Sequence, residues 1–461
     1  MSNSLKSFVV GNIIMTVFVE LIIIFSGPSQ YKILFLAPLF HCVLSILFSD
    51  VYIKCTQNII ILICVLGYFL KLVVIPVLDC CFENVSVLDD YNIIETTLLP
   101  SVCLFSYEML IVFLVIKNHM KRSQNNWLLI KKDQVIDYSK VKISFGSLLI
   151  ISSLLIIALI LLYLFPDLSS YFIKIGISTD EVIMRYSISQ NTRLSMGYLY
   201  WIATVIFDLL NYILPGILFI FIMNVFKKKW VQNFIAILLA FFLCNFVSDQ
   251  AYISYISALT ILVLLYFNNK KVIKKHKVIF TLIMAFGAFF VIYMISTKNY
   301  GIEITYASLV NAYFPAYNNL GFSLLIDNKI ALFINDILKS IPLVKGFFTA
   351  LPSGLSDFDE LVSGYSNVQG QIIPMIGQGR MYFGFIFAPI LSAIVMKASL
   401  VVNETFYRTN SFWLKYYALI LAVSGALTIF MYNFSTFISM FCYICPFYFI
   451  FKTTEKRNGY K

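Results

Sequence analysis

Long apolar runs alternate with short polar segments along almost the whole chain. A membrane-spanning helix needs about 20 mostly apolar residues to cross the hydrocarbon core of a bilayer. Twelve segments come close to this requirement. They are Ser7–Ser26, Ile33–Ser49, Ile59–Leu78, Thr97–Lys117, Ser144–Phe165, Gly197–Phe226, Trp230–Val247, Ala251–Asn268, Val278–Thr297, Tyr382–Lys397, Ser411–Met431 and Thr436–Phe451. The sixth is overlong and contains Pro215, which predicts a kink or an interfacial turn.

The composition favours a membrane protein over a soluble one. Hydrophobic residues make up 60% of the chain and charged residues 12%, whereas a soluble domain has about 25% charged residues. A large soluble protein with several buried helices would need polar helix faces, and most of these segments have none. The sequence therefore predicts an all-α integral membrane protein with about 12 transmembrane helices.

The basic residues predict the orientation of these helices. If the N-terminus is cytoplasmic and the loops alternate, the inner segments hold most of the 34 lysines and arginines, and the outer segments are net acidic. This distribution follows the positive-inside rule and predicts that both termini are cytoplasmic. The net charge of +11 does not indicate nucleic acid, because the basic residues form no patch among aromatic residues.

One predicted outer loop, residues 298–381, is much longer than the others. It separates nine transmembrane helices in residues 1–297 from three in residues 382–461. Its apolar stretches Ile330–Leu338 and Pro342–Leu351 are too short to span and suit amphipathic helices at the membrane interface. Long loops usually have a function, so this loop is the default functional site.

Three arginines are expected on the acidic outer face: Arg185, Arg193 and Arg380. The guanidinium group grips phosphate or carboxylate through two parallel hydrogen bonds. Arg380 is expected near the lipid headgroups, where the diphosphate of a lipid carrier would lie. Each arginine could instead anchor to headgroups or pair with a nearby acid.

The end of the long loop is polar and rich in glycine, and such a composition suits carbohydrate. Tyr365 and Gln371 are candidate glycan contacts. Asp357, Asp359 and Glu360 are candidate bases for activating a sugar hydroxyl. The alternative for these three acids is a solvated acidic turn.

Four charged residues fall inside predicted spans: Glu20, Lys71, Glu108 and Asp208. Charges within a membrane are expensive and often functional. Lys71 could neutralise one of the acids in a salt bridge, the acids could snorkel to an interface, or they could couple transport to protons. The cysteines and histidines lack the spacing of a zinc site, and no nucleotide-binding motif stands in a suitable context, so neither metal nor cofactor is expected.

The loop ends in the pattern P-x-x-G-x-G-R-x-x-x-G, formed by Pro374, Gly377, Gly379, Arg380 and Gly384. Together with twelve spans, a large late outer loop and the segment FPAYNNLGFSLL (Phe314–Leu325), this pattern resembles the Wzy-type O-antigen and capsule polymerases of bacteria. The resemblance departs at the predicted turn between spans seven and eight. Several relatives have a basic residue there, and this chain has Asp249 and Gln250.

The resemblance implies a glycosyltransferase on the periplasmic face of the inner membrane, acting in lipopolysaccharide or capsule biosynthesis. Such enzymes transfer a glycan from one undecaprenyl diphosphate carrier to the repeat unit on another, without a nucleotide sugar. It implies that the three outer arginines hold the diphosphate. Membrane lipids, a chain-length regulator and a flippase are the further partners that it implies, and nucleic acid is not among them.

Two other functions fit the same spans. A lipid-linked oligosaccharide flippase, or another transporter, is expected to have short loops and internal repeats. This chain shows no repeat, and its long outer loop argues against a flippase. An O-antigen ligase has a functional histidine in its large outer loop. The three histidines here, His41, His119 and His276, all lie elsewhere.

Overall fold

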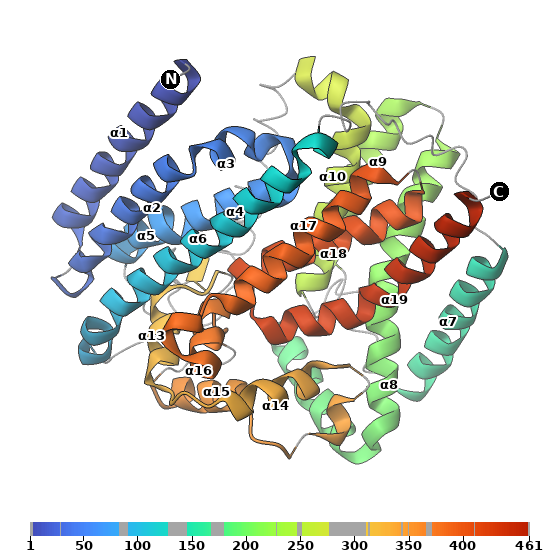
Figure 1. Ribbon diagram of the computed structural model, residues 1–461. Coiled ribbons are helices and arrows are strands. Elements are labelled where there is room, and N and C mark those ends of the chain that lie inside the picture. Colours follow the sequence, from blue (N-terminus) through green and yellow to red (C-terminus); the bar gives the residue numbers. More distant parts are fainter. Residues whose placement is uncertain are drawn as a thin grey trace.

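The computed structural model describes residues 3–27, 29–82, 91–127, 145–166, 179–226, 228–246, 251–275, 310–311, 314–342, 344–348, 350–365, 371–409 and 411–459, in some helix ends only as backbone. Every regular element within these ranges is a helix (Figure 1). The first half contains α1 (Asn3–Ser26), α2 (Leu36–Leu47), α3 (Ser49–Lys54), α4 (Ile59–Phe69), α5 (Ile75–Phe82), α6 (Tyr91–Trp127), α7 (Phe145–Leu164) and α8 (Thr179–Val225). The second half contains α9 (Lys229–Phe246), α10 (Ala251–Lys275), α13 (Tyr317–Leu325), α14 (Ile330–Ser340), α15 (Gly354–Tyr365), α16 (Met375–Phe387), α17 (Ile390–Arg408), α18 (Phe412–Met431) and α19 (Phe434–Gly459).

Seven helices within the described ranges are long and apolar enough to cross a membrane. They are Leu5–Ser26, Ile59–Phe82, Glu95–Arg122, Tyr198–Val225, Ile390–Arg408, Phe412–Met431 and Phe434–Thr453. The pair Tyr31–Leu47 and Ser49–Gln57 also qualifies when taken together, but it bends by 77°. The predicted class, a helical membrane protein, is confirmed at this level.

Predicted spans five, seven and eight coincide with α7, α9 and α10. The described apolar stretches of these helices are Ser152–Leu164, Lys229–Leu243 and Ile256–Phe267. Span nine, residues 278–297, lies outside the described residues. The count of twelve therefore stays a prediction.

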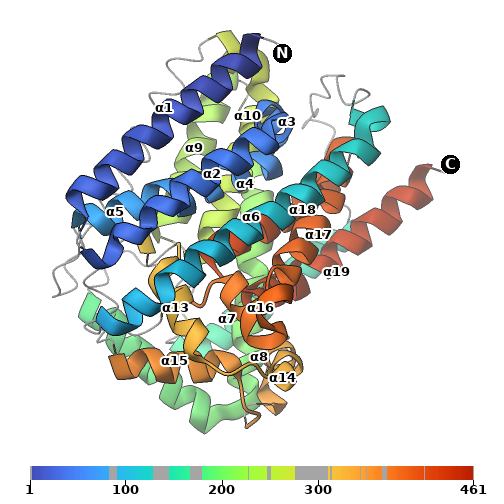
Figure 2. The same cartoon turned by 60° about the vertical axis from the view of Figure 1, so that its left-hand side comes forward.

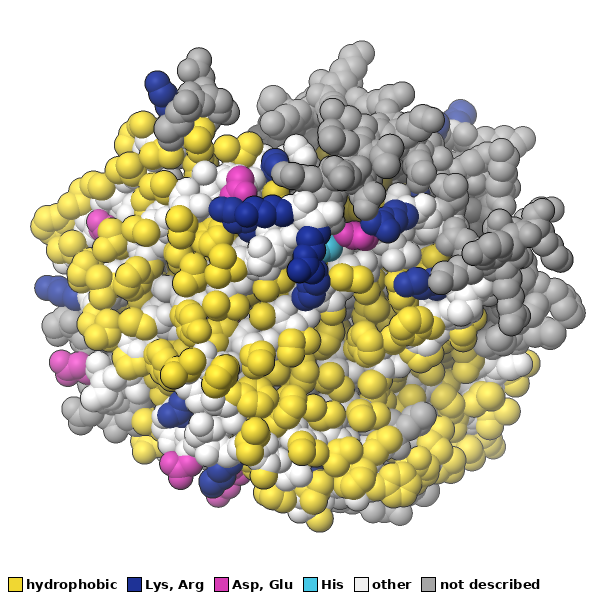
Figure 3. All heavy atoms as spheres, in the orientation of Figure 1, with side chains coloured by type: hydrophobic (Ala, Val, Ile, Leu, Met, Phe, Trp, Pro, Cys, Tyr) yellow, Lys and Arg dark blue, Asp and Glu magenta, His cyan; other side chains and the backbone are white. Residues whose placement is uncertain are grey.

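Helix α18 forms the centre of the bundle, and α1 lies at its edge (Figures 1 and 2). In α18, 89% of the membrane-length window is buried, against 17% in α1. A helix buried on all sides must be apolar on all sides, as α18 is. Apolar side chains also cover much of the surface in Figure 3. That exposure suits lipid rather than water.

The two ends of the chain lie at one end of the bundle, and α13, α14 and α15 of the long loop lie at the opposite end (Figures 1 and 2). In α14, Ile330 and Ile334 are exposed while Leu332 is buried. This exposed apolar edge suits a helix that lies at a membrane interface, as predicted. The assignment of the termini to the cytoplasm stays a prediction.

The tenth span differs from its predicted bounds of Tyr382–Lys397. Helix α16 ends at Phe387, and the membrane-length helix runs from Ile390 to Arg408. Gly384 has a φ of 77°, a conformation that glycine adopts readily and other residues rarely do. This glycine and Pro389, at the N-cap of α17, break the helix where the hydropathy continues.

The segment Pro342–Leu351 was expected to be an amphipathic helix, and this expectation is wrong. Its described residues contain a single 3₁₀ turn, Lys345–Phe347. The carbonyl of Pro342 accepts a hydrogen bond from Trp201 Nε1 at 2.6 Å, and the ammonium of Lys345 lies 3.9 Å from the centroid of the Trp201 ring. These contacts with α8 hold the segment in an irregular form.

Candidate functional site

The glycine-rich pattern of the long loop forms α16, which packs on α13. Pro374 is the N-cap of α16. A Cβ on Gly377 would come within 2.6 Å of Ser323 Oγ on α13, and a Cβ on Gly379 would overlap the backbone oxygen of Ala388. The two glycines therefore allow α16 to approach α13 and the turn into α17 more closely than any other residue would.

Arg380 joins the same two helices. Its Nη1 donates to the carbonyl oxygen of Ser323 at 3.1 Å and to that of Ile326. These carbonyls lie at the C-terminal end of α13, where a cation is favoured by the helix dipole. Burial lowers the pKa of Arg380, whereas the charge of Asp327 raises it. Among the described residues, neither Nε nor Nη2 has a hydrogen-bond partner.

The other two candidate arginines lie on α8. Arg185 and Arg193 belong to its first half, but their side chains lie outside the described residues. The expectation that the three arginine side chains lie in one site therefore stays a prediction.

The candidate bases lie on α15, which begins beside α14 and α16. Asp357 is in the first turn, and Asp359 and Glu360 are exposed. Desolvation raises the pKa of Asp359 above its usual value. At the end of α15 the Tyr365 ring lies 5.9 Å from that of Phe322 on α13.

The other candidate glycan contact also lies against α13. The Oε1 of Gln371 accepts a hydrogen bond from Asn319 Nδ2 at 3.2 Å. The neighbouring Asn318 is buried, and its amide oxygen and nitrogen both lack a hydrogen-bond partner within the described part of the chain. A buried polar group without a partner is unusual, so Asn318 joins the candidates for contact with a ligand. Helix α13 thus contacts Arg380, Tyr365 and Gln371, all expected in one site.

A buried carboxylate on α14, which the sequence analysis does not name as a candidate, binds residues of α16 and of the start of α15. Asp336 is 1% exposed, and its Oδ1 accepts a hydrogen bond from Ser353 Oγ at 2.5 Å. Its Oδ2 accepts from the backbone amide of Gly354 at 3.1 Å and from the Tyr382 hydroxyl. Gln378 Nε2 donates to Tyr382 Oη at 2.7 Å. Burial raises the pKa of Asp336, and its three donors act in the opposite direction.

Replacing Asp336 with asparagine is expected to lower the free energy of unfolding by about 1–3 kcal/mol. The amide group of asparagine would face a donor, and the Gly354 N–H cannot turn away. The thermal midpoint of the full chain in detergent measures the effect. The control is Glu360→Gln at an exposed site. Equal midpoints for the two variants would contradict the role given to Asp336.

The charges within the spans are now placed. Lys71 and Glu108 are fully buried, and their charges interact. Lys71 Nζ donates to the carbonyl of Ile429 at 3.2 Å, and Glu108 Oε1 accepts from Ser392 Oγ. Glu108 is one of the three acids predicted as partners for Lys71, and its charge acts on Lys71.

The other two acids have different surroundings. Asp208 is buried, and its Oδ2 accepts a hydrogen bond from the Tyr443 hydroxyl at 2.8 Å. Glu20 is half-buried on α1, and its Oε1 is buried with no hydrogen-bond partner among the residues that the structure describes.

Two hydrogen bonds connect the long loop to the α4–α5 span. The Tyr317 hydroxyl donates to the carbonyl of Lys71 at 2.9 Å. Lys71 lies in a π-helical turn, Leu70–Val74, just before Pro76, and such turns often mark functional sites. Asn311 Nδ2 donates to Asp79 Oδ1 at 2.9 Å. These hydrogen bonds therefore connect the candidate site to buried residues of the bundle.

The described residues bring together no three Cys, His, Asp or Glu side chains that could hold a metal ion. Their chemistry is that of amides, carboxylates and one arginine, which suits hydroxyl groups and phosphates. In comparisons with the models of known protein families, with curated proteins and with solved structures, the chain matched none.

Proposed function

We propose that the chain polymerises oligosaccharide repeat units linked to undecaprenyl diphosphate, at the periplasmic face of the bacterial inner membrane, in the synthesis of O-antigen or capsule. The observation that carries the proposal is the state of Arg380. One of its nitrogens holds the end of α13, and its other donors lack a partner among the described residues. A half-buried guanidinium that is held through one nitrogen, with further donors beside it, is suited to hold a diphosphate.

The proposed reaction is a glycosyl transfer between two lipid carriers. The hydroxyl oxygen of the acceptor sugar attacks the anomeric carbon of the donor glycan, and the bond from that carbon to the donor diphosphate breaks. The hydroxyl proton passes to a carboxylate of α15, for which the raised pKa of Asp359 is favourable. Arg380 stabilises the charge on the departing diphosphate, and Arg185 and Arg193 are proposed to assist it.

Two alternative functions, a flippase or other transporter and a ligase, have less support than the polymerase. A flippase or other transporter moves one bundle against another around a site near the midplane. The hydrogen bonds of Tyr317 and Asn311 instead fasten the long loop to the spans. A ligase of the resembling kind uses a histidine in its outer loop, and residues 298–381 contain none.

Deleting the gene in its host tests the proposal. Loss of a polymerase leaves a single repeat unit on the lipid core, because export and ligation continue. Loss of a flippase or a ligase leaves none. Surface polysaccharide is separated on a gel, with the complemented strain as control. A ladder of unchanged length after deletion would contradict all three functions.

A purified system tests the chemistry directly. The full chain in detergent, given only undecaprenyl-diphosphate-linked repeat units, is expected to lengthen the lipid-linked glycan without a nucleotide sugar. Mass spectrometry of the lipid fraction measures the number of units on each carrier. Failure to lengthen the glycan in a well-folded preparation would refute the polymerase.

A further inference from the structure

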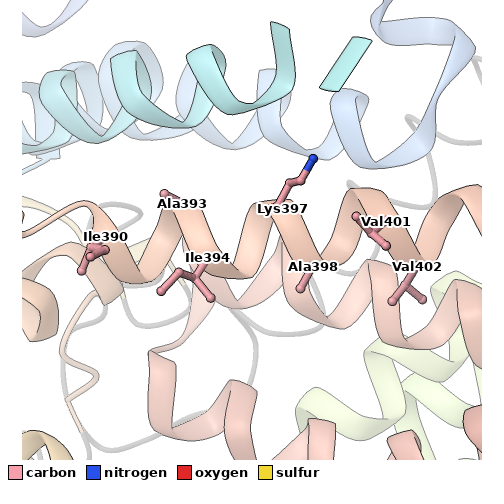
Figure 4. Close-up of a pocket in the computed structure, with 7 residues that line it drawn as sticks. All are labelled: Ile390, Ala393, Ile394, Lys397, Ala398, Val401 and Val402. Atoms are coloured by element: carbon pink, nitrogen blue, oxygen red, sulfur yellow. The ribbon is translucent and has the colours of Figure 1, made fainter. Parts of the chain in front are cut away.

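One face of α17 carries an apolar groove of about 550 Å³. It is lined by Ile390, Ala393, Ile394, Lys397, Ala398, Val401 and Val402 (Figure 4). Ile394 and Val401 are strongly exposed, with 53% and 49% of their surface accessible. Because this helix is a candidate membrane span, the groove faces the lipid.

Contacts with α6 give the level of the groove in the bundle. The hydroxyl of Tyr107, midway along the α6 span, donates to the carbonyl of Ile386, just before α17. Lys397 reaches His119 near the end of that span, with Nζ 3.4 Å from Nδ1. The groove between residues 390 and 402 is about 18 Å long at 1.5 Å per residue, close to the ~15 Å of one hydrocarbon leaflet. It therefore runs from mid-bundle toward the end that carries both termini.

Lys397 brings an uncompensated charge to this groove. Glu404, on the same helix, is in contact through both oxygens, with His119 Nε2 at 3.0 Å and with Arg408 Nη2 at 2.9 Å. Among the described residues, Lys397 has no carboxylate partner. Figure 4 shows its amine pointing away from α17 toward the neighbouring helix, while the other labelled side chains are apolar. The charge of Arg122 also acts on His119, so positive charge exceeds negative charge among the described residues around His119.

We infer that this groove binds one anionic phospholipid, in the leaflet on the side of the two termini. An acyl chain lies along the apolar residues Ile394, Ala398 and Val401, and the lipid phosphate pairs with Lys397. A zwitterionic lipid would bring a second cation to a site with excess positive charge.

Native mass spectrometry of the full chain, mixed with equal amounts of phosphatidylglycerol and phosphatidylcholine, tests this inference. The wild-type chain is expected to retain one phosphatidylglycerol in preference to phosphatidylcholine. Lys397→Gln is expected to reduce that preference about fivefold, the effect of one basic residue at a membrane surface. Ala398→Phe is expected to fill the groove and to remove binding of both lipids.

The matched control is Lys329→Gln. Lys329 is exposed at the N-cap of α14, at the end of the bundle opposite the two termini (Figure 1). The control variant should prefer phosphatidylglycerol as strongly as the wild type does. Thermal midpoints measured without added lipid show whether each variant is folded. Equal retention of the two lipids by the wild type would overturn the inference, as would a preference that survives Lys397→Gln. A dimer abolished by Ala398→Phe, or equal stabilisation by inorganic phosphate, would also overturn it.

Discussion

Replacing Gly379 with alanine is expected to lower the free energy of unfolding by about 3 kcal/mol or more, toward the upper range for a single substitution. The added Cβ would overlap the backbone oxygen of Ala388. A side chain could rotate away, but this oxygen belongs to the turn that separates α16 from α17. Because α16 also carries Arg380, the strain should displace the guanidinium from α13. The thermal midpoint and the yield of folded chain in detergent measure the effect.

Gly364→Ala is the matched control. Gly364 lies on α15 in the same loop, and nothing is within 4 Å of a Cβ placed there. Alanine at a compatible helical position is expected to raise stability by about 0.4–1 kcal/mol. If both variants melted at the wild-type temperature, the close approach of α16 to the start of α17 would be refuted.

The class of the fold could be predicted because the apolar runs are long. Segments such as Ile59–Phe82 and Phe412–Met431 have the length and hydropathy of a span, and both are visible without any tertiary information. Hydropathy does not report a backbone break, however. The tenth span was misplaced because Gly384 and Pro389 interrupt a run that stays apolar throughout.

Tertiary contacts explain the other error in the long loop. The pattern of residues 342–351 suits an amphipathic helix, but Trp201 lies far away in the sequence and binds both Pro342 and Lys345. Such a partner cannot be found from periodicity. The cue available in the sequence was Pro342 itself, together with Gly346, since both residues weaken a short helix.

The site could be predicted in part. Arg380 and the glycines near it stood out as a pattern, and the structure gives several of them a packing role. Asp336 was missed because it lies in the apolar run IALFINDIL, where one acid resembles the polar edge of an interfacial helix. Its partners Ser353 and Tyr382 lie 17 and 46 residues further along the chain. The choice of Glu108 as the acid acting on Lys71 likewise needed three-dimensional contacts.

Replacing Arg380 with lysine is expected to reduce polymerisation by about 10²–10³-fold, the usual effect of losing a group that stabilises developing negative charge. A lysine can still donate to the two carbonyls at the end of α13, so the fold should persist. It cannot present a second pair of donors to a diphosphate, because its charge is a single ammonium. The length of the polysaccharide ladder, in cells with equal protein levels, measures the loss.

Two further variants separate the roles of this side chain. Arg380→Ala removes the carbonyl bonds as well, so it should lower both the thermal midpoint and polymerisation, whereas Arg380→Lys should lower polymerisation alone. Arg408→Lys is the matched control, because Arg408 lies on the far side of the bundle and is 57% exposed beside Glu404. A full ladder in Arg380→Lys would show that the open donors of this arginine hold no diphosphate. Arg380 would then serve only to join α16 to α13, and the proposed polymerase would lose the observation that carries it.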